Sequence, residues 1–342
     1  MSFLISLEKY ILAISPFLLL GLTIAGFVHI FLDVDKVKKL INTGKIRDIF
    51  MSAFLGVPLP LCSCAVIPSA VTLRKSGVRN GATSSFLIST PETGVDSIMV
   101  TYAMMDFPMT IVRPLAAFIS ASFAGILQHF FNDFEYKKEV EVKSCCKKSS
   151  TSIPSDSISG KFKEAIRFAY VDLLDDIAHW LFVGILTGAL IDYYVPVDLF
   201  LSLDGTLAKL LILLVGIPMY VCASATTPIA AALVAKGLTP GAALIFLLVG
   251  PATNISNILV LQKYIGKKGV VLNIVSIAVV SLILSFIVDF IYTYFSLPVI
   301  FKVSHQHSHG ASIFDYLLSA AFVLLLIVSL IKTNYNKYLK RS

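Results

Sequence analysis

Residues 56–68 read Gly56-Val-Pro-Leu-Pro-Leu-Cys62-Ser-Cys64-Ala-Val-Ile-Pro68, and residues 216–228 read Gly216-Ile-Pro-Met-Tyr-Val-Cys222-Ala-Ser224-Ala-Thr-Thr-Pro228. The second stretch repeats the first at an offset of 160 residues, and the alignment continues without a gap to Ile98 and Ile258. Fifteen of these 43 aligned positions are identical. A duplicated, proline-interrupted segment in a hydrophobic chain is typical of a membrane transporter that is built from two repeats.

The composition indicates a polytopic membrane protein. Of its 342 residues, 56% are hydrophobic and 14% are charged, whereas a soluble domain carries about 25% charged residues. Nine apolar segments are each about long enough to cross a bilayer core. They cover residues 10–31, 49–73, 80–105, 108–131, 177–197, 210–235, 240–262, 269–290 and 313–331. We expect an all-α membrane protein whose first apolar segment is retained, since no small-residue cleavage site follows it.

The distribution of Lys and Arg predicts the topology. If segments 49–73 and 210–235 each enter and leave the membrane on one side, 23 basic residues are cytoplasmic and 4 are external. If both segments cross fully, the split is 13 to 14. Cytoplasmic loops are enriched in Lys and Arg, so the re-entrant arrangement is favoured, with the N-terminus outside and the C-terminus in the cytoplasm. An ordinary helix with a proline kink is the alternative for each segment.

In the favoured topology each repeat has three crossings and one re-entrant hairpin. This number is odd, so the two repeats insert upside down relative to each other, as in many secondary transporters. The predicted division is a first repeat at 1–131, a cytoplasmic linker at 132–169, a second repeat at 170–296, an external loop at 297–312, and a C-terminal helix with a basic tail at 313–342. The net charge of +7 then reflects cytoplasmic loops, and no nucleic-acid partner is expected.

Three cysteines lie just beyond proline breaks in apolar segments. Pro58 and Pro60 interrupt helix geometry ahead of Cys62 and Cys64, and Cys222 is the counterpart of Cys62 in the second repeat. Broken backbone is tolerated in lipid only where it lines a protein cavity, so an inverted two-fold arrangement would bring these thiols together. Three sulfurs suit a soft ion such as Cu(I), trivalent arsenic or Zn(II). The alternative is that the cysteines fill space as small apolar side chains.

Two polar motifs interrupt apolar spans at matching positions: Thr90-Pro91-Glu92-Thr93-Gly94-Val95-Asp96 and Gly250-Pro251-Ala252-Thr253-Asn254-Ile255-Ser256-Asn257. Glu92 and Asp96 lie four residues apart, on one helical face. Carboxylates inside a membrane span commonly serve as ion or proton sites, so we expect a relay here; a structural tie to Arg113 is the alternative. The side chains expected to line the pathway are Pro58, Pro60, Thr90, Pro91, Thr93, Thr226, Thr227, Pro251, Thr253, Asn254 and Asn257.

Two further groups are candidate metal ligands outside the spans. Cys145 and Cys146 lie between lysines in the linker, where basic neighbours should favour thiolates that capture a soft ion from the cytosol. His305, His307 and His309 alternate in the external loop and could accept the ion after export. Idle polar loops are the alternative for both groups. The chain has no phosphate-binding loop, so we expect no built-in ATP hydrolysis.

The motifs at 56–64, 89–97 and 222–228, with Gly-Pro-Ala-Thr-Asn at 250–254, make the chain similar to the ArsP/YraQ-type permeases. It most resembles the branch described as Cu/Zn efflux transporters, over about residues 1–295. The resemblance implies efflux of a heavy metal or an organoarsenical across the bacterial inner membrane. It also implies that Cys62, Cys64 and Cys222 are candidate ligands.

The sequence therefore predicts a multi-pass inner-membrane permease for heavy-metal resistance, not an enzyme. We expect it to export copper or zinc as substrate through a thiolate site at the bilayer midplane, with proton coupling and no permanently bound cofactor. Expected partners are the lipid bilayer, the metal or metalloid, and a cytosolic metal donor. One alternative is efflux of trivalent (organo)arsenicals, which needs the three cysteines without the histidines. Another is a membrane thiol-redox protein that uses Cys62 and Cys64.

Overall fold

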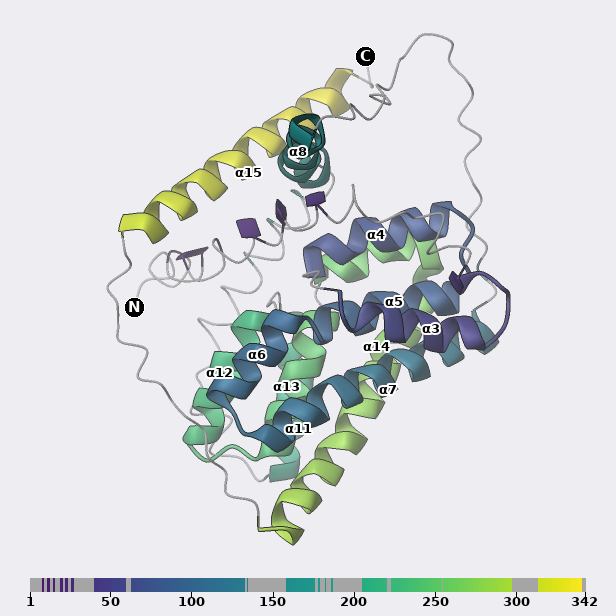
Figure 1. Cartoon of the computed structure of the whole chain (residues 1–342), viewed down its shortest axis with the longest axis vertical. Coiled ribbons are helices and arrows are strands. Elements are labelled where there is room, and N and C mark those ends of the chain that lie inside the picture. The colour runs from purple at the N-terminus through teal and green to yellow at the C-terminus, as the bar shows by residue number, and fades with distance from the viewer. Residues whose placement is uncertain are drawn as a thin grey trace.

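The computed structural model describes residues 40–59, 63–132, 134, 158–175, 205–219, 223–253, 255–296 and 313–339, with scattered single residues at 8–27 and 178–186. Within this part of the chain every regular element is a helix (Figure 1). The expected all-α class is confirmed for these residues.

Helices before residue 132 form one set, and a set with similar boundaries follows about 160 residues later. The first set consists of α3 (Arg47–Gly56), α4 (Ser63–Lys75), α5 (Asn80–Glu92), α6 (Val95–Met104) and α7 (Phe107–Phe131). The second consists of α11 (Gly205–Gly216), α12 (Ala223–Ala235), α13 (Pro240–Ala252) and α14 (Ile255–Tyr294). Gly266 has a φ of 76° and divides α14, at the position that corresponds to Asp106 just before α7.

The expected spans 80–105 and 240–262 are each interrupted between two helices. Thr93 follows α5 with φ −126° and Thr253 follows α13 with φ −116°, so both leave the helical region. Thr93 Oγ1 lies 2.7 Å from Ser89 O and 3.4 Å from Val57 O. Thr253 Oγ1 makes the corresponding contacts, with carbonyl oxygens of residues 249 and 217 at 2.8 and 3.3 Å. The same break with the same side-chain contacts therefore occurs twice.

Helices α3 and α5 lie side by side and run in the same direction. Near their starts, Arg79 Nη1 donates to Gly44 O at 3.0 Å, and Ser85 Oγ donates to Ile49 O at 2.9 Å. At their ends they meet through the Thr93 contact with residue 57. If α3 and α4 formed a single kinked helix, the turn after it would make α5 run antiparallel to α3. Instead, the chain runs in one direction along α3, reverses, and comes back along α4 before α5 begins.

Helices α11 and α13 are also parallel. Lys209 near the start of α11 forms a 2.7 Å salt bridge with Asp289, and the backbone N–H of Gly241 at the start of α13 donates to the same carboxylate at 2.6 Å. At the other end, Thr253 contacts residue 217. The second out-and-back excursion, along α11 and α12, thus matches the first.

The two long helices α7 and α14 run antiparallel and are tied at both ends. Gln128 Nε2, near the end of α7, donates to Gly269 O at 2.5 Å and to Asn273 Oδ1 at 2.7 Å. Beside the start of α7, the Tyr292 hydroxyl donates to the Asp106 carboxylate, with oxygen–oxygen distances of 2.6 and 2.8 Å. Phe107–Phe131 and Val260–Tyr294 are also the two helices in the described chain that are long and apolar enough to cross a membrane.

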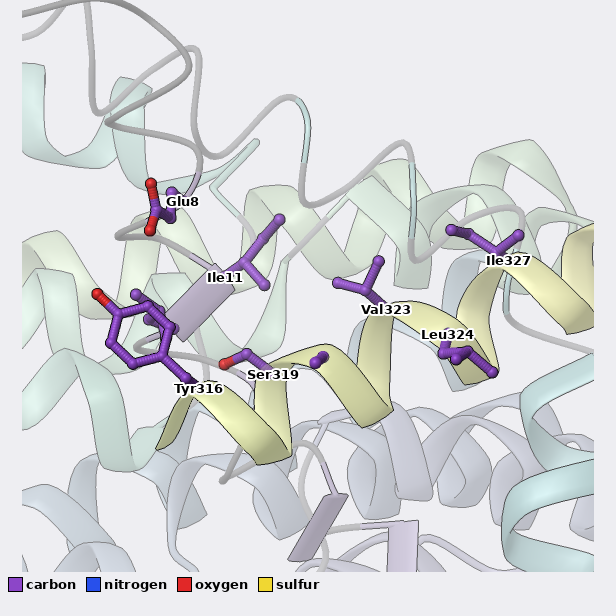
Figure 2. A pocket seen from close by; sticks show the side chains of 9 residues that line it. Glu8, Ile11, Tyr316, Ser319, Val323, Leu324 and Ile327 are labelled. Carbon is purple, nitrogen blue, oxygen red and sulfur yellow. The ribbon is translucent and has the colours of Figure 1, made fainter. Parts of the chain in front are cut away.

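In the view of Figure 1, α15 (Ile313–Leu339) and α8 (Ile158–Arg167) both appear on the side of the picture away from α7 and α14. Asp175, just after the π-helix η1 (Phe168–Leu173), accepts hydrogen bonds from Ser329 at 2.7 Å and Lys332 at 2.5 Å. Figure 2 shows an apolar groove of about 580 Å³ along α15, with Glu8, Tyr316 and Ser319 as its polar lining.

Candidate functional site

Helix α5 is buried along its whole length although its sequence is polar. It reads NGATSSFLISTPE, whereas α13 at the same offset reads PGAALIFLLVGPA. Buried hydroxyl and carboxyl groups are costly unless they are hydrogen-bonded, so a polar helix in this place calls for a function. The 160-residue offset pairs Glu92 with Ala252, and this difference in polarity recurs at several other positions along the two helices.

Glu92 is the last residue of α5, and it is fully buried with 0% exposure. Neither of its carboxyl oxygens has a hydrogen-bond partner among the described residues. The positive charge of Arg113 acts on Glu92 through space, but the hydrogen-bonded tie between them that the sequence allowed is absent. Asp96 lies in the first turn of α6, and its side chain is outside the described part of the structure.

Arg113 is a fully buried cation in the second turn of α7. Its Nη1 donates to Thr101 Oγ1 at 2.6 Å and to Thr227 Oγ1 at 2.8 Å. Longer hydrogen bonds of 3.3 Å reach the carbonyl oxygens of Ser97 and Ala223. Arg113 therefore joins α6 to the first turns of α12, whereas the sequence had offered it as a structural tie to Glu92 or Asp96.

A second polar cluster joins α5, α7 and α14, and sequence reasoning missed it. Asn273 occupies the position equivalent to Arg113; it donates to Ser84 Oγ at 3.3 Å and accepts from Gln128 at 2.7 Å. Asn132 donates to Gln128 Oε1 at 2.6 Å and to Ile265 O at 2.9 Å. Amides within apolar spans are the sequence signal that could have indicated this cluster, because buried polar groups require partners.

Most residues that were predicted to line the pathway are enclosed at the breaks between helices. The buried ones are Thr90, Pro91, Thr93, Thr226, Thr227, Pro251 and Thr253. Pro58 is exposed. Pro60 and Asn254 lie outside the described residues, as does the side chain of Asn257. Apart from Pro58, the structure thus brings the described threonines and prolines that were predicted for the pathway into the interior.

The predicted thiol and imidazole ligands lie almost entirely outside the described residues. This applies to Cys62, Cys145, Cys146, Cys222, His305, His307 and His309. Cys64 belongs to the first turn of α4, but its side chain is not described. Among the side chains that are described, no group of three or more His, Cys, Asp or Glu residues could hold a metal ion. The thiolate site stays a prediction.

A family model for predicted permeases, named ArsP_1, matches residues 1–290. The chain belongs to this family. It is therefore a membrane permease, and the family implies a transporter rather than an enzyme. No solved structure matches the chain.

Three relatives come from distant organisms. A protein of Streptococcus mutans serotype c, described as a subunit of a two-component membrane permease complex, is 28% identical over 258 residues, which cover 74% of this chain and 83% of that protein. UPF0718 protein YcgR of Bacillus subtilis is 23% identical over 272 residues, 78% of this chain and 90% of its own. UPF0718 protein MJ0584 of Methanocaldococcus jannaschii is 21% identical over 308 residues, which cover 73% of this chain and 84% of that protein.

Proposed function

We propose that this permease exports a soft heavy-metal ion, copper or zinc, by alternating access between two inverted halves, with a proton exchanged at Glu92. The antiparallel packing of α7 and α14 is the observation that supports the inverted arrangement of the two halves. The second part of α14 corresponds to α7 at the 160-residue offset, and contacts at both ends fix the opposite directions of the two helices. A two-fold axis along the membrane normal would make equivalent helices parallel, so this packing favours an axis in the membrane plane.

The paired out-and-back segments support the re-entrant topology. In each half, the helix before the break and the buried helix after the return begin at the same end of the molecule. Segments 49–73 and 210–235 then each enter and leave on one side, which is the arrangement that places most Lys and Arg in the cytoplasm. Backbone that is broken in this way is tolerated where it lines a cavity between protein segments.

The proposed substrate site lies at the starts of α4 and α12. These helices begin at Ser63 and Ala223, each next in sequence to one of the paired cysteines, Cys62 and Cys222. With Cys64 they would supply three thiolates to a soft ion. A metal cation needs a site with negative charge, and thiolates together with Glu92 would offset the buried charge of Arg113.

The remaining predicted ligands have accessory roles in this proposal. Cys145 and Cys146 would collect the ion in the cytosol, and Asp96 would share the relay with Glu92. His305, His307 and His309 would receive the ion outside. A trivalent organoarsenical is the second candidate substrate, since the ArsP_1 family match and the three thiols are equally compatible with it. Export of an organoarsenical would not require the histidines.

Efflux from proteoliposomes tests the proposal, with Cu(I), Zn(II) and phenylarsenite as separate probes. Variants Cys62→Ser and Cys222→Ser should lose most of the transport rate, whereas Ser281→Ala should retain it, because the Ser281 hydroxyl donates to Ala278 O within its own helix. Replacing all three loop histidines by Ala should slow copper or zinc export and leave arsenite export intact. Equal rates for wild type and the cysteine variants would contradict a thiolate site.

A further inference from the structure

We infer that protons reach Glu92 through the first half only, along a seam of hydroxyl groups between α3 and α5. The hydroxyl seam consists of Ser52 on α3 with Ser85 and Ser89 on α5. This inference deepens the proposed function: it rests on Glu92 as the proton-exchanging group and adds the route by which protons reach Glu92.

The seam lies on facing sides of two touching helices. Ser85, Ser89 and Glu92 are spaced four and three residues apart, so they share one face of α5. That face meets α3: Ser85 donates to Ile49 O at 2.9 Å, and a Cβ added at Gly56 would lie 2.0 Å from Ser89 Oγ. On α3, Ser52 lies three residues after Ile49 and four residues before Gly56. It therefore faces α5 between Ser85 and Ser89.

Each member of the seam can relay a proton. All three serines have 0% exposure, and Ser52 Oγ has no hydrogen-bond partner among the described residues. Ser85 and Ser89 donate to carbonyl oxygens, which leaves both hydroxyl oxygens able to accept. Buried polar groups without protein partners usually bond to internal water. Such waters would complete a chain that ends at the unpartnered carboxyl group of Glu92.

The seam points to the end of the molecule where α3 and α5 begin. There the chain is polar and exposed: Arg79 is exposed and donates to Gly44 O, while Asp48 accepts from the Thr43 hydroxyl and the Gly44 N–H. Water at this end can exchange protons with the Glu92 carboxyl group along the hydroxyls, in either direction. In the proposed topology this end is cytoplasmic.

The second half lacks the seam. Ser52, Ser85, Ser89 and Glu92 correspond at the 160-residue offset to Ile212, Ile245, Val249 and Ala252. All four counterparts are buried and apolar. Apolar side chains neither donate nor accept hydrogen bonds, so this half offers no corresponding route.

The electrostatic surroundings of Glu92 are asymmetric as well. The charged or titratable groups on the helices that pack against α5 are Arg47 and Asp48 on α3, Cys64, Arg74 and Lys75 on α4, Arg113 and His129 on α7, and Lys263, Tyr264, Lys267, Lys268, Asp289, Tyr292 and Tyr294 on α14. Helix α13 contributes none. Arg113 is the buried cation on α7 whose charge acts on Glu92.

Infrared spectroscopy after a rapid pH jump tests the seam without any metal. The protein is reconstituted in liposomes, and the carboxylic acid band of Glu92 is identified by its loss in Glu92→Gln. In Ser52→Ala combined with Ser89→Ala, protonation should slow by about ten-fold or more, since removing a proton-transfer partner has effects of this order. Ser281→Ala is the matched control and should keep the wild-type rate.

Restoring a hydroxyl distinguishes proton relay from a packing defect. Ser52→Thr should protonate Glu92 at close to the wild-type rate, whereas Ser52→Val, of similar volume, should be slow. Equal rates in these two variants, or a Glu92 band that follows Na⁺ at constant pH, would overturn the inference. Because no metal is present, a failure of copper or zinc export in the efflux assay would leave this result unaffected.

Discussion

At the residue scale, Gly56 and Gly216 are equivalent in sequence and differ in their surroundings. A Cβ at Gly56 would lie 2.0 Å from Ser89 Oγ and 2.8 Å from Thr90 Oγ1, whereas one at Gly216 would lie 3.4 Å from Val249 Cγ1. We predict that Gly56→Ala destabilises the protein by about 1–3 kcal/mol, because the buried Ser89 and Thr90 side chains, or α3 itself, must shift to make room. Gly216→Ala is the matched control and should be close to neutral. Thermal unfolding in detergent, followed by the monodisperse fraction, measures both; equal shifts would contradict the close approach.

Arg113 gives a second prediction at this scale. Thr227→Val removes one acceptor of the buried guanidinium and should cost about 1–2 kcal/mol, since a buried charged donor loses a partner. Thr226→Val is the control, because the Thr226 hydroxyl donates to Ala223 O within its own helix. The difference between the two unfolding midpoints is the measurement, and no difference would argue against the tie between α6 and α12.

At the scale of elements, hydropathy located the apolar segments and misjudged their continuity. Segment 80–105 is long enough for one crossing helix, yet it is divided at Thr93 and Gly94. Hydropathy averaged over a window of residues does not detect a single proline and threonine that change the direction of the backbone. The polar motif at this position was the usable signal, and it indicated the interruption but not the directions of the two helices.

The packing of α7 on α14 can be tested by a double-mutant cycle on Gln128 and Asn273. Their side-chain hydrogen bond of 2.7 Å links helices that are tied again at the far end. We predict that Gln128→Leu and Asn273→Leu each destabilise the protein and that the double variant costs less than the sum, with a coupling of about 0.5–2 kcal/mol. Strictly additive unfolding free energies would show that the pair does not hold these helices together.

For the whole molecule, the proposed inverted arrangement makes a prediction about sidedness. Ser76 and Lys236 are equivalent residues in the turns after α4 and α12, just before Gly77 and Gly237 with φ of 94° and 110°. In intact cells, a membrane-impermeant thiol reagent should label Lys236→Cys and spare Ser76→Cys, because inversion places equivalent turns on opposite faces. Both variants are compared with the parent protein. Labelling of both positions, or of neither until the cells are opened, would contradict the inverted topology.

The sequence by itself determined the helical class, the repeat at 160 residues, the asymmetry between Glu92 and Ala252, and the permease family, because these depend on composition and on residue order along the chain. Only the tertiary structure decided that α3 is parallel to α5 and that α7 is antiparallel to α14. It also decided that Arg113 bonds Thr101 and Thr227 rather than Glu92. Arg113 and Thr227 are 114 residues apart, and which distant groups meet in a low-dielectric interior depends on the packing of whole helices, which local patterns do not encode.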